Sequence, residues 1–178
     1  MSATIRPGTA ADLKELGIVE EEADTLFTGH DYLFQSTKNF DQEGHRTLAA
    51  GTVFDALNSN ALFVAEVDGV MAGFIVMRAL ETYAWVEQIS VRPAYSRQGI
   101  GRSLMQRGER WATDNDFHVT ALSTFRDITW NELYYRKLGY TEMPKRLVTK
   151  ELLEIRAREV GHGLLGDHRI FMFRDARH

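Results

Sequence analysis

The residues with the clearest chemical potential lie between a predicted strand over residues 86–91 and a predicted helix that follows directly. Gly99 and Gly101 stand in the turn, and Arg97 and Arg102 lie beside them. Glycine lets the backbone approach a ligand closely, and the first turn of a helix presents unpaired N–H groups at its positive dipole end. The spacing predicts a phosphate-binding turn. A tight connection without a ligand is the alternative. The turn is not a P-loop, because no Gly-Lys-Ser/Thr follows the glycines, and it lacks the third glycine of a Rossmann dinucleotide site.

The strand before this turn is the third in a row. The segments Ala61–Val67 and Val70–Arg78 are apolar, and Asp68-Gly69 between them is a strong hairpin signal. A short link leads into the strand of residues 86–91, which ends at Pro93 because proline has no N–H to donate to a ladder. The sequence therefore predicts three consecutive antiparallel strands before the glycine turn.

The remaining elements alternate between helices and strands. In chain order, the pattern predicts a strand over residues 3–6, a helix after Thr9, a helix over 44–57, a strand over 118–123, a helix over 130–138, a strand from 140, a helix over 149–160 and a strand over 168–173. We expect one α/β (α+β) domain over residues 1–178, with a mixed central sheet of about seven strands flanked by helices.

Composition excludes several classes of protein. The 178 residues carry a net charge of −4, so a basic nucleic-acid footprint is absent. The chain has no cysteine, which excludes disulfides, thiolate metal sites and a cysteine nucleophile and fits a reducing cytoplasm. No apolar run approaches the roughly 18 residues that cross a bilayer, and the N-terminus lacks the apolar core of a signal peptide.

The strand, turn and helix together resemble motif A of the GNAT superfamily of acetyl-CoA-dependent N-acetyltransferases. In that motif a strand ending Val-x-Pro precedes Gln/Arg-x-x-Gly-x-Gly/Ala and a helix. Val91-Arg92-Pro93 matches the strand end, and Gly99 and Gly101 match the two small positions, whereas Ser96 departs from the expected Gln or Arg. The resemblance implies acetyl-CoA, with its pyrophosphate held by Arg97, Gln98, Gly99, Ile100, Gly101 and Arg102.

Residues 130–140 resemble motif B of the same family, whose core is aromatic/aliphatic-Tyr-x-x-x-Gly-Phe/Tyr. Tyr135 matches the tyrosine that protonates the departing CoA thiolate in many members, and Gly139 matches the helix end. A phenol with a pKa of about 10 suits this transfer, since a cysteine-like thiol has a pKa near 8.5. Packing alone is the alternative role. Tyr134 points about 100° away on the helix and is expected in the core.

Asn131 lies one helical turn before Tyr135, on the same side of the predicted helix. Family members place a CoA-contacting asparagine seven residues before the tyrosine, a position that Ile128 holds here. The resemblance therefore makes Asn131 a candidate contact for the pantetheine arm, and a cap at the start of the helix is the alternative.

The central strand supplies the candidate base. An amine attacks a thioester only when it is neutral, so its proton must leave, often through water to a carboxylate. Glu87 is the candidate, because several family members use a glutamate on this strand, and alternation places it on the face of Ile89 and Val91. A structural pair with an arginine is the alternative. By resemblance, backbone N–H groups of Ile89, Ser90 and Val91 would pair with pantetheine and polarise the acyl carbonyl.

Two segments outside these motifs are expected to shape the acceptor site: residues 20–41 and Gly161–Gly166. The first begins with an acidic run, Glu20 to Asp24, which is either a solvated helix face or a rim that attracts a cationic substrate. The second fits G-x-G-x-x-G literally but follows a helix, which argues against a dinucleotide site. The six histidines show no metal-ligand spacing, so no metal is expected.

The sequence thus predicts an acyltransferase that moves an acetyl group from acetyl-CoA to a primary amine of a small molecule or peptide by direct attack. A non-catalytic acyl-CoA sensor or partner domain of the same fold is the alternative, and a phosphate-binding protein of another kind is the third hypothesis. The expected partners are acetyl-CoA and an amine acceptor, without nucleic acid or membrane. Because many family members dimerise, the resemblance also implies a homodimer, which the last predicted strand would support.

Overall fold

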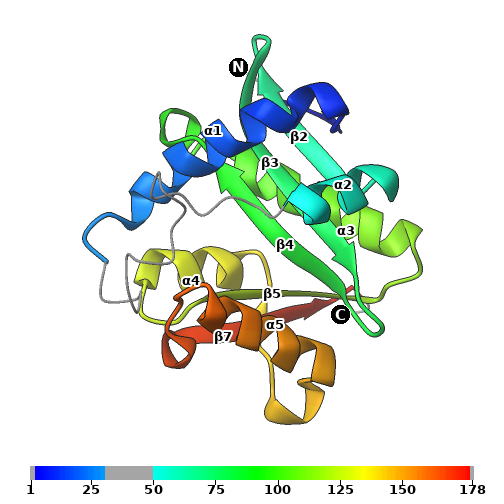
Figure 1. Ribbon diagram of the computed structural model, residues 1–178, viewed down its shortest axis with the longest axis vertical. Helices are drawn as coiled ribbons and strands as arrows, with labels where there is room; N and C mark the ends of the chain where they lie inside the picture. The colour runs from blue at the N-terminus through cyan, green and yellow to red at the C-terminus, as the bar shows by residue number, and fades with distance from the viewer. Residues whose placement is uncertain (1–2, 31–49, 177–178) are drawn as a thin grey trace.

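A computed structural model describes residues 3–30 and 50–176, and its centre is a mixed sheet (Figure 1). The strand order is β1-β2-β3-β4-β5-β7-β6, and only β4 and β5 run parallel. The seven strands are β1 (Thr4–Pro7), β2 (Leu62–Val67), β3 (Val70–Ala79), β4 (Ala84–Val91), β5 (Val119–Phe125), β6 (Thr141–Glu142) and β7 (Arg169–Asp175). The predicted mixed seven-stranded sheet is confirmed.

The hairpin of β2 and β3 has the predicted turn. Asp68 and Gly69 both have positive φ angles, 50° and 78°, and the flanking Val67 and Val70 are paired. Two such residues in succession match the twist of the strands they join, which is why Asp-Gly favours this turn. The strands β2, β3 and β4 follow one another in antiparallel order, as expected.

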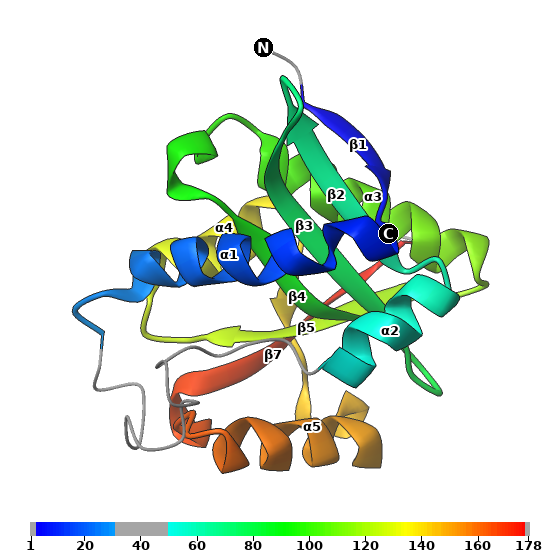
Figure 2. The same ribbon diagram turned by 45° about the horizontal axis from the view of Figure 1, so that its top comes forward.

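Five α-helices of the described residues cover the two faces of the sheet (Figure 2). One face carries α3 and α4 and is called the α3 face; the other carries α1, α2 and α5 and is called the α5 face. The bounds are α1 (Leu13–Asp24), α2 (Ala50–Asn58), α3 (Ile100–Asp114), α4 (Thr129–Lys137) and α5 (Lys150–Gly161). The helix predicted over residues 44–57 lies partly outside the described residues.

The first helical segment is anchored by a buried carboxylate. Asp12 is 8% exposed and accepts hydrogen bonds from both terminal nitrogens of Arg6 at 2.9 and 2.8 Å and from the N–H of Thr9 at 2.8 Å. These donors hold the pKa of Asp12 at about 2, mainly through the Arg6 hydrogen bonds. This cluster fixes the start of α1 to strand β1.

Strand β4 is irregular on both of its edges. Its parallel pairing with β5 is recorded only at Ala84–Thr120 and Trp85–Ala121. On its other side the register skips one residue, because Val76 pairs with Gln88 whereas Met77 pairs with Val86. Glu87 is thus the extra residue of a β-bulge, and bulges bend a strand and re-aim its side chains. Within the described chain, β4 beyond Trp85 has no partner strand on its β5 side.

Candidate active site

The glycine turn lies between the end of β4 and the start of α3. Gly99 has φ 83° and caps the helix, and the N–H of Ser103 donates to its carbonyl at 3.0 Å. The N–H groups of Ile100, Gly101 and Arg102 therefore precede the first helical hydrogen bond of α3 and have no partner within the helix. This is the geometry of an anion site.

The side chains of the turn divide into exposed and buried groups. Arg97, Gln98 and Arg102 are exposed, whereas Ile100 is 4% exposed and packs in the core. The Nε2 of Gln98 donates to the carbonyl of Ala94 at 3.3 Å, which ties the turn to the preceding residues. Ile100 can therefore offer only its backbone, and the arginines offer charge.

Gly101 is close-packed against α4. A Cβ on Gly101 would lie 2.7 Å from the hydroxyl oxygen of Tyr134 and 3.8 Å from a methyl carbon of Val91. The Tyr134 oxygen is buried, and no described residue forms a hydrogen bond with it. Burial raises the pKa of this phenol far above its ordinary value of 10. The sequence predicted that Tyr134 packs in the core. It gave no indication that the hydroxyl of Tyr134 lies against the glycine turn.

Tyr135 lies in the main core, next to Tyr134. It is 9% exposed, and its ring lies edge-on to Tyr134 and Tyr140 with centroid separations of 5.1 and 6.2 Å. Burial raises the pKa of Tyr135 to about 12, against an opposing contribution from Arg169. Its phenol therefore keeps its proton at neutral pH, as a general acid must.

Glu87 does not share a face with Ile89 and Val91, so strict alternation was wrong here. Val91 lies beside Gly101 on the α3 face, and Ile89 pairs with Ile75 on that same face. The carboxylate of Glu87 instead lies 3.2 Å from the guanidinium of Arg78.

The bulge explains the change of face. The neighbour of Arg78, Met77, contacts α3 at Gly108, so alternation along β3 directs Arg78 to the α5 face. The side chain of Glu87 follows its partner there and is 18% exposed. The predicted alternative, a pair with an arginine, is present; a role as base stays a prediction.

Asn131 does not cap its helix. Ile128 is the N-cap residue of α4, and the side-chain oxygen of Asn131 accepts a hydrogen bond from the Thr124 hydroxyl of β5. The bond fixes the start of α4 to β5 close to Tyr135. Contact between Asn131 and a cofactor stays a prediction.

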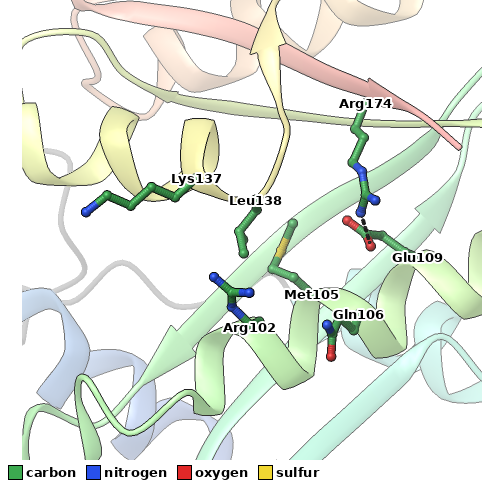
Figure 3. A pocket seen from close by; sticks show the side chains of 7 residues that line it. All are labelled: Arg102, Met105, Gln106, Glu109, Lys137, Leu138 and Arg174. Atoms are coloured by element: carbon green, nitrogen blue, oxygen red, sulfur yellow. Dashed lines mark hydrogen bonds and ion pairs between the residues drawn. The ribbon is translucent and has the colours of Figure 1, made fainter. Parts of the chain in front are cut away.

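A small cavity of about 140 Å³ lies between α3 and the end of α4 (Figure 3). The Arg174 guanidinium pairs with Glu109 at 2.5 Å on one side. Arg102 and Lys137 are exposed on the other, and neither is ion-paired within the described residues. The cavity is lined by Arg102, Met105, Gln106, Glu109, Lys137, Leu138 and Arg174. Sequence reasoning missed it because its residues come from three distant segments.

The acidic run of α1 is solvated only in part. Glu20 is 6% exposed, and Glu22 pairs with Arg92 at 2.5 Å. Arg92 also pairs with Glu15 and donates to the carbonyl of Met71 at 2.8 Å. These contacts hold α1 against the end of β4. The aromatic part of the predicted acceptor segment, from residue 31 on, lies outside the described residues.

The loop predicted over Gly161–Gly166 connects α5 to the last strand, as expected. It is anchored by Arg156, which donates to the carbonyl of Gly166 at 2.7 Å and is paired with Glu159 at 3.0 Å. Arg169 of β7 pairs with the same carboxylate at 2.6 Å. The loop is thus held by charged groups between α5 and β7.

Two features are absent from residues 3–30 and 50–176, the part of the chain that the structure describes. Among them no group of three or more acidic or histidine side chains is arranged to bind a metal ion. No helix in these ranges combines the length and apolar character that a bilayer crossing needs.

Comparison with known proteins agrees with this architecture. The family model described as Acetyltransferase (GNAT) family matches residues 26–140. Among solved structures, the Escherichia coli ribosomal-protein-S18-alanine N-acetyltransferase is 18% identical with a TM-score of 0.63, covering 98% of this chain and 94% of that one. The paia N-acetyltransferase from Thermoplasma acidophilum, solved with coenzyme A, is 16% identical with a TM-score of 0.66, covering 98% and 99%. At sequence identities of 18% and 16%, the similarity to these structures establishes the fold alone.

Proposed function

Because the chain belongs to the acetyltransferase (GNAT) family, we propose that it is an N-acetyltransferase that moves an acetyl group from acetyl-CoA to a primary amine of a small molecule or peptide. The observation that carries this proposal is the start of α3, where three N–H groups without a partner in the helix lie beside the edge of β4 that no described strand pairs. One element can hold the phosphates and the other an extended arm.

The cofactor-binding roles follow from this placement. The backbone of residues 97–102 would hold the pyrophosphate, with charge from Arg97 and Arg102. The edge of β4 at Ile89, Ser90 and Val91 would pair with the pantetheine arm and polarise the acyl carbonyl. Asn131 would contact the same arm from the start of α4.

The cavity between α3 and α4 suits the third phosphate of CoA. Arg102 and Lys137, which are among its lining residues, lack ion-pair partners among the described residues, and two cations without such partners attract a dianionic group. We assign to them the 3′-phosphate of the adenosine. Dephospho-CoA lacks the 3′-phosphate, so comparing its binding with that of CoA tests this assignment.

The proposed reaction is direct attack of the amine on the thioester. The nitrogen–carbon bond forms, the carbon–sulfur bond breaks, and the thiolate takes the proton of Tyr135. Glu87, or water that it activates, takes the proton from the amine. Burial raises the pKa of Tyr135, so the phenol carries its proton at neutral pH. Transfer to the thiolate, whose thiol has a lower pKa, then requires the sulfur to lie within hydrogen-bond reach of the phenol. A non-catalytic acyl-CoA binder of the same fold would need no such acid.

Cellular location and oligomeric state stay proposals. The absence of cysteine supports a cytoplasmic location. For the homodimer, the prediction named the last strand. β7 pairs with β5 along its length but with β6 only at Met172 and Phe173, so a dimer through this strand stays a prediction.

The first test is thermal unfolding with acetyl-CoA, CoA and ATP in separate samples. A ligand that binds the folded state raises the melting temperature by mass action. We expect a rise with acetyl-CoA and CoA and none with ATP, followed by thiol release in a panel of primary amines. Absence of a rise at saturating acetyl-CoA would refute the assignment.

A further inference from the structure

The hydroxyl of Tyr134 is a buried donor for which no described residue provides an acceptor. We propose that it donates a hydrogen bond to a phosphate oxygen of the bound cofactor at the start of α3, which makes Tyr134 a cofactor-binding residue. This inference rests on the proposed function and adds a residue that helix geometry alone predicted to be in the core.

The position of the hydroxyl supports this role. Its oxygen would lie 2.7 Å from a Cβ on Gly101, so it lies against the backbone of the first turn of α3. The N–H of Gly101 is one of the three that precede the first helical hydrogen bond. The hydroxyl and this N–H therefore belong to the same corner of the site, and the charge of Arg102 is close enough to affect the phenol.

A buried hydroxyl without a partner destabilises a protein, because it loses water and gains nothing in return. Two other buried tyrosines pair their hydroxyls and so avoid this loss of stability. Tyr83 donates to the carbonyl of Leu147 at 2.6 Å, and Tyr140 donates to Glu109 at 3.1 Å. Phenylalanine would fill the same space without an unpaired hydroxyl. A function of the Tyr134 hydroxyl in ligand binding explains why tyrosine stands there.

Protonation agrees with a donor role. Burial raises the pKa of Tyr134 far above its ordinary value, so the phenol is neutral throughout the physiological range and carries a proton to donate. Phosphate oxygens only accept, which makes the two groups complementary.

The test compares Tyr134→Phe with wild type by titration calorimetry with CoA and by unfolding without ligand. We expect CoA to bind about tenfold more weakly, the value of a hydrogen bond to a charged group. The unliganded variant should melt at the same temperature or roughly 2 °C higher, since an unsatisfied hydroxyl is gone. Tyr83→Phe is the matched control: it loses a paired hydroxyl beside α5, so stability should fall while CoA affinity is unchanged.

A second readout locates the contact on the ligand. Acetyl-CoA and S-acetylpantetheine differ by the nucleotide and its phosphates, so Tyr134→Phe should lower kcat/KM for acetyl-CoA and leave the value for S-acetylpantetheine unchanged. Equal losses for both would overturn the phosphate assignment. Unchanged CoA affinity in Tyr134→Phe would overturn the inference and leave the proposed function intact, whereas a wild-type protein that fails to bind CoA would refute both.

Discussion

The contact between Gly101 and Tyr134 gives the sharpest stability prediction. In Gly101→Ala the new methyl carbon would lie 2.7 Å from the Tyr134 oxygen, well inside van der Waals contact. Overpacking of this kind costs about 1–3 kcal/mol, and alanine returns up to about 1 kcal/mol through its higher helix propensity. We expect a net loss of about 1 kcal/mol in the free energy of unfolding.

A second substitution should reverse this loss. In Gly101→Ala with Tyr134→Phe the nearest atom becomes the ring carbon Cζ, 3.4 Å from the methyl group, which is close to ordinary contact. The double variant should therefore be at least as stable as wild type. The two substitutions should be coupled by about 1–2 kcal/mol, as expected for residues in contact.

Urea unfolding of wild type, both single variants and the double variant completes the cycle. The slope of free energy against denaturant should stay constant, so that midpoints report stability. Additive effects, or a Gly101→Ala protein as stable as wild type, would refute the reasoning, because either result means that the hydroxyl does not limit the space at residue 101.

Three further predictions concern single groups. Tyr135→Phe should lower kcat at least tenfold with CoA affinity unchanged, measured by thiol release and calorimetry; wild-type turnover in this variant would exclude Tyr135 as the acid. Lys137→Ala should weaken CoA binding about threefold to tenfold and leave dephospho-CoA binding unchanged, and an equal loss for both ligands would contradict the 3′-phosphate assignment. For Asp12, the pKa of about 2 lies below the ordinary aspartate value of 3.8, so its stabilising contribution is present above pH 3.8 and is lost as pH falls through 2. Acid unfolding of wild type and Asp12→Asn should show this loss only in wild type, and parallel curves would refute it.

Local chemistry made most of the fold predictable. Asp68-Gly69 predicts its turn because both residues tolerate positive φ. Gly99 likewise takes the left-handed conformation at the cap of α3, and Gly139 does so after α4, at φ 90°. Each of these residues determines the backbone only within a few positions along the chain. Such turns and helix ends can therefore be predicted without knowing the tertiary contacts.

The parts that escaped prediction depend on contacts between distant segments. A bulge is a property of two strands in register, so the extra residue at Glu87 cannot be read from β4 alone. The hydroxyl of Tyr134 becomes informative only when α4 packs on Gly101. The pairing of Glu22 with Arg92 likewise joins residues 70 positions apart, which is why the acidic run resembled a solvated face.

The bulge bears on how the two substrates would meet. The phosphate-binding turn, Tyr134 and the cavity lie with α3 and α4, whereas the carboxylate of Glu87 pairs with Arg78, which β3 directs to the α5 face. Under the proposed reaction, the cofactor therefore occupies the α3 face and the amine must approach Glu87 from the opposite one. The edge of β4 beyond Trp85, which no described strand pairs on its β5 side, borders both faces of the sheet. A single inserted residue would then serve both substrates, because it bends the strand away from β5 and turns the base toward the acceptor.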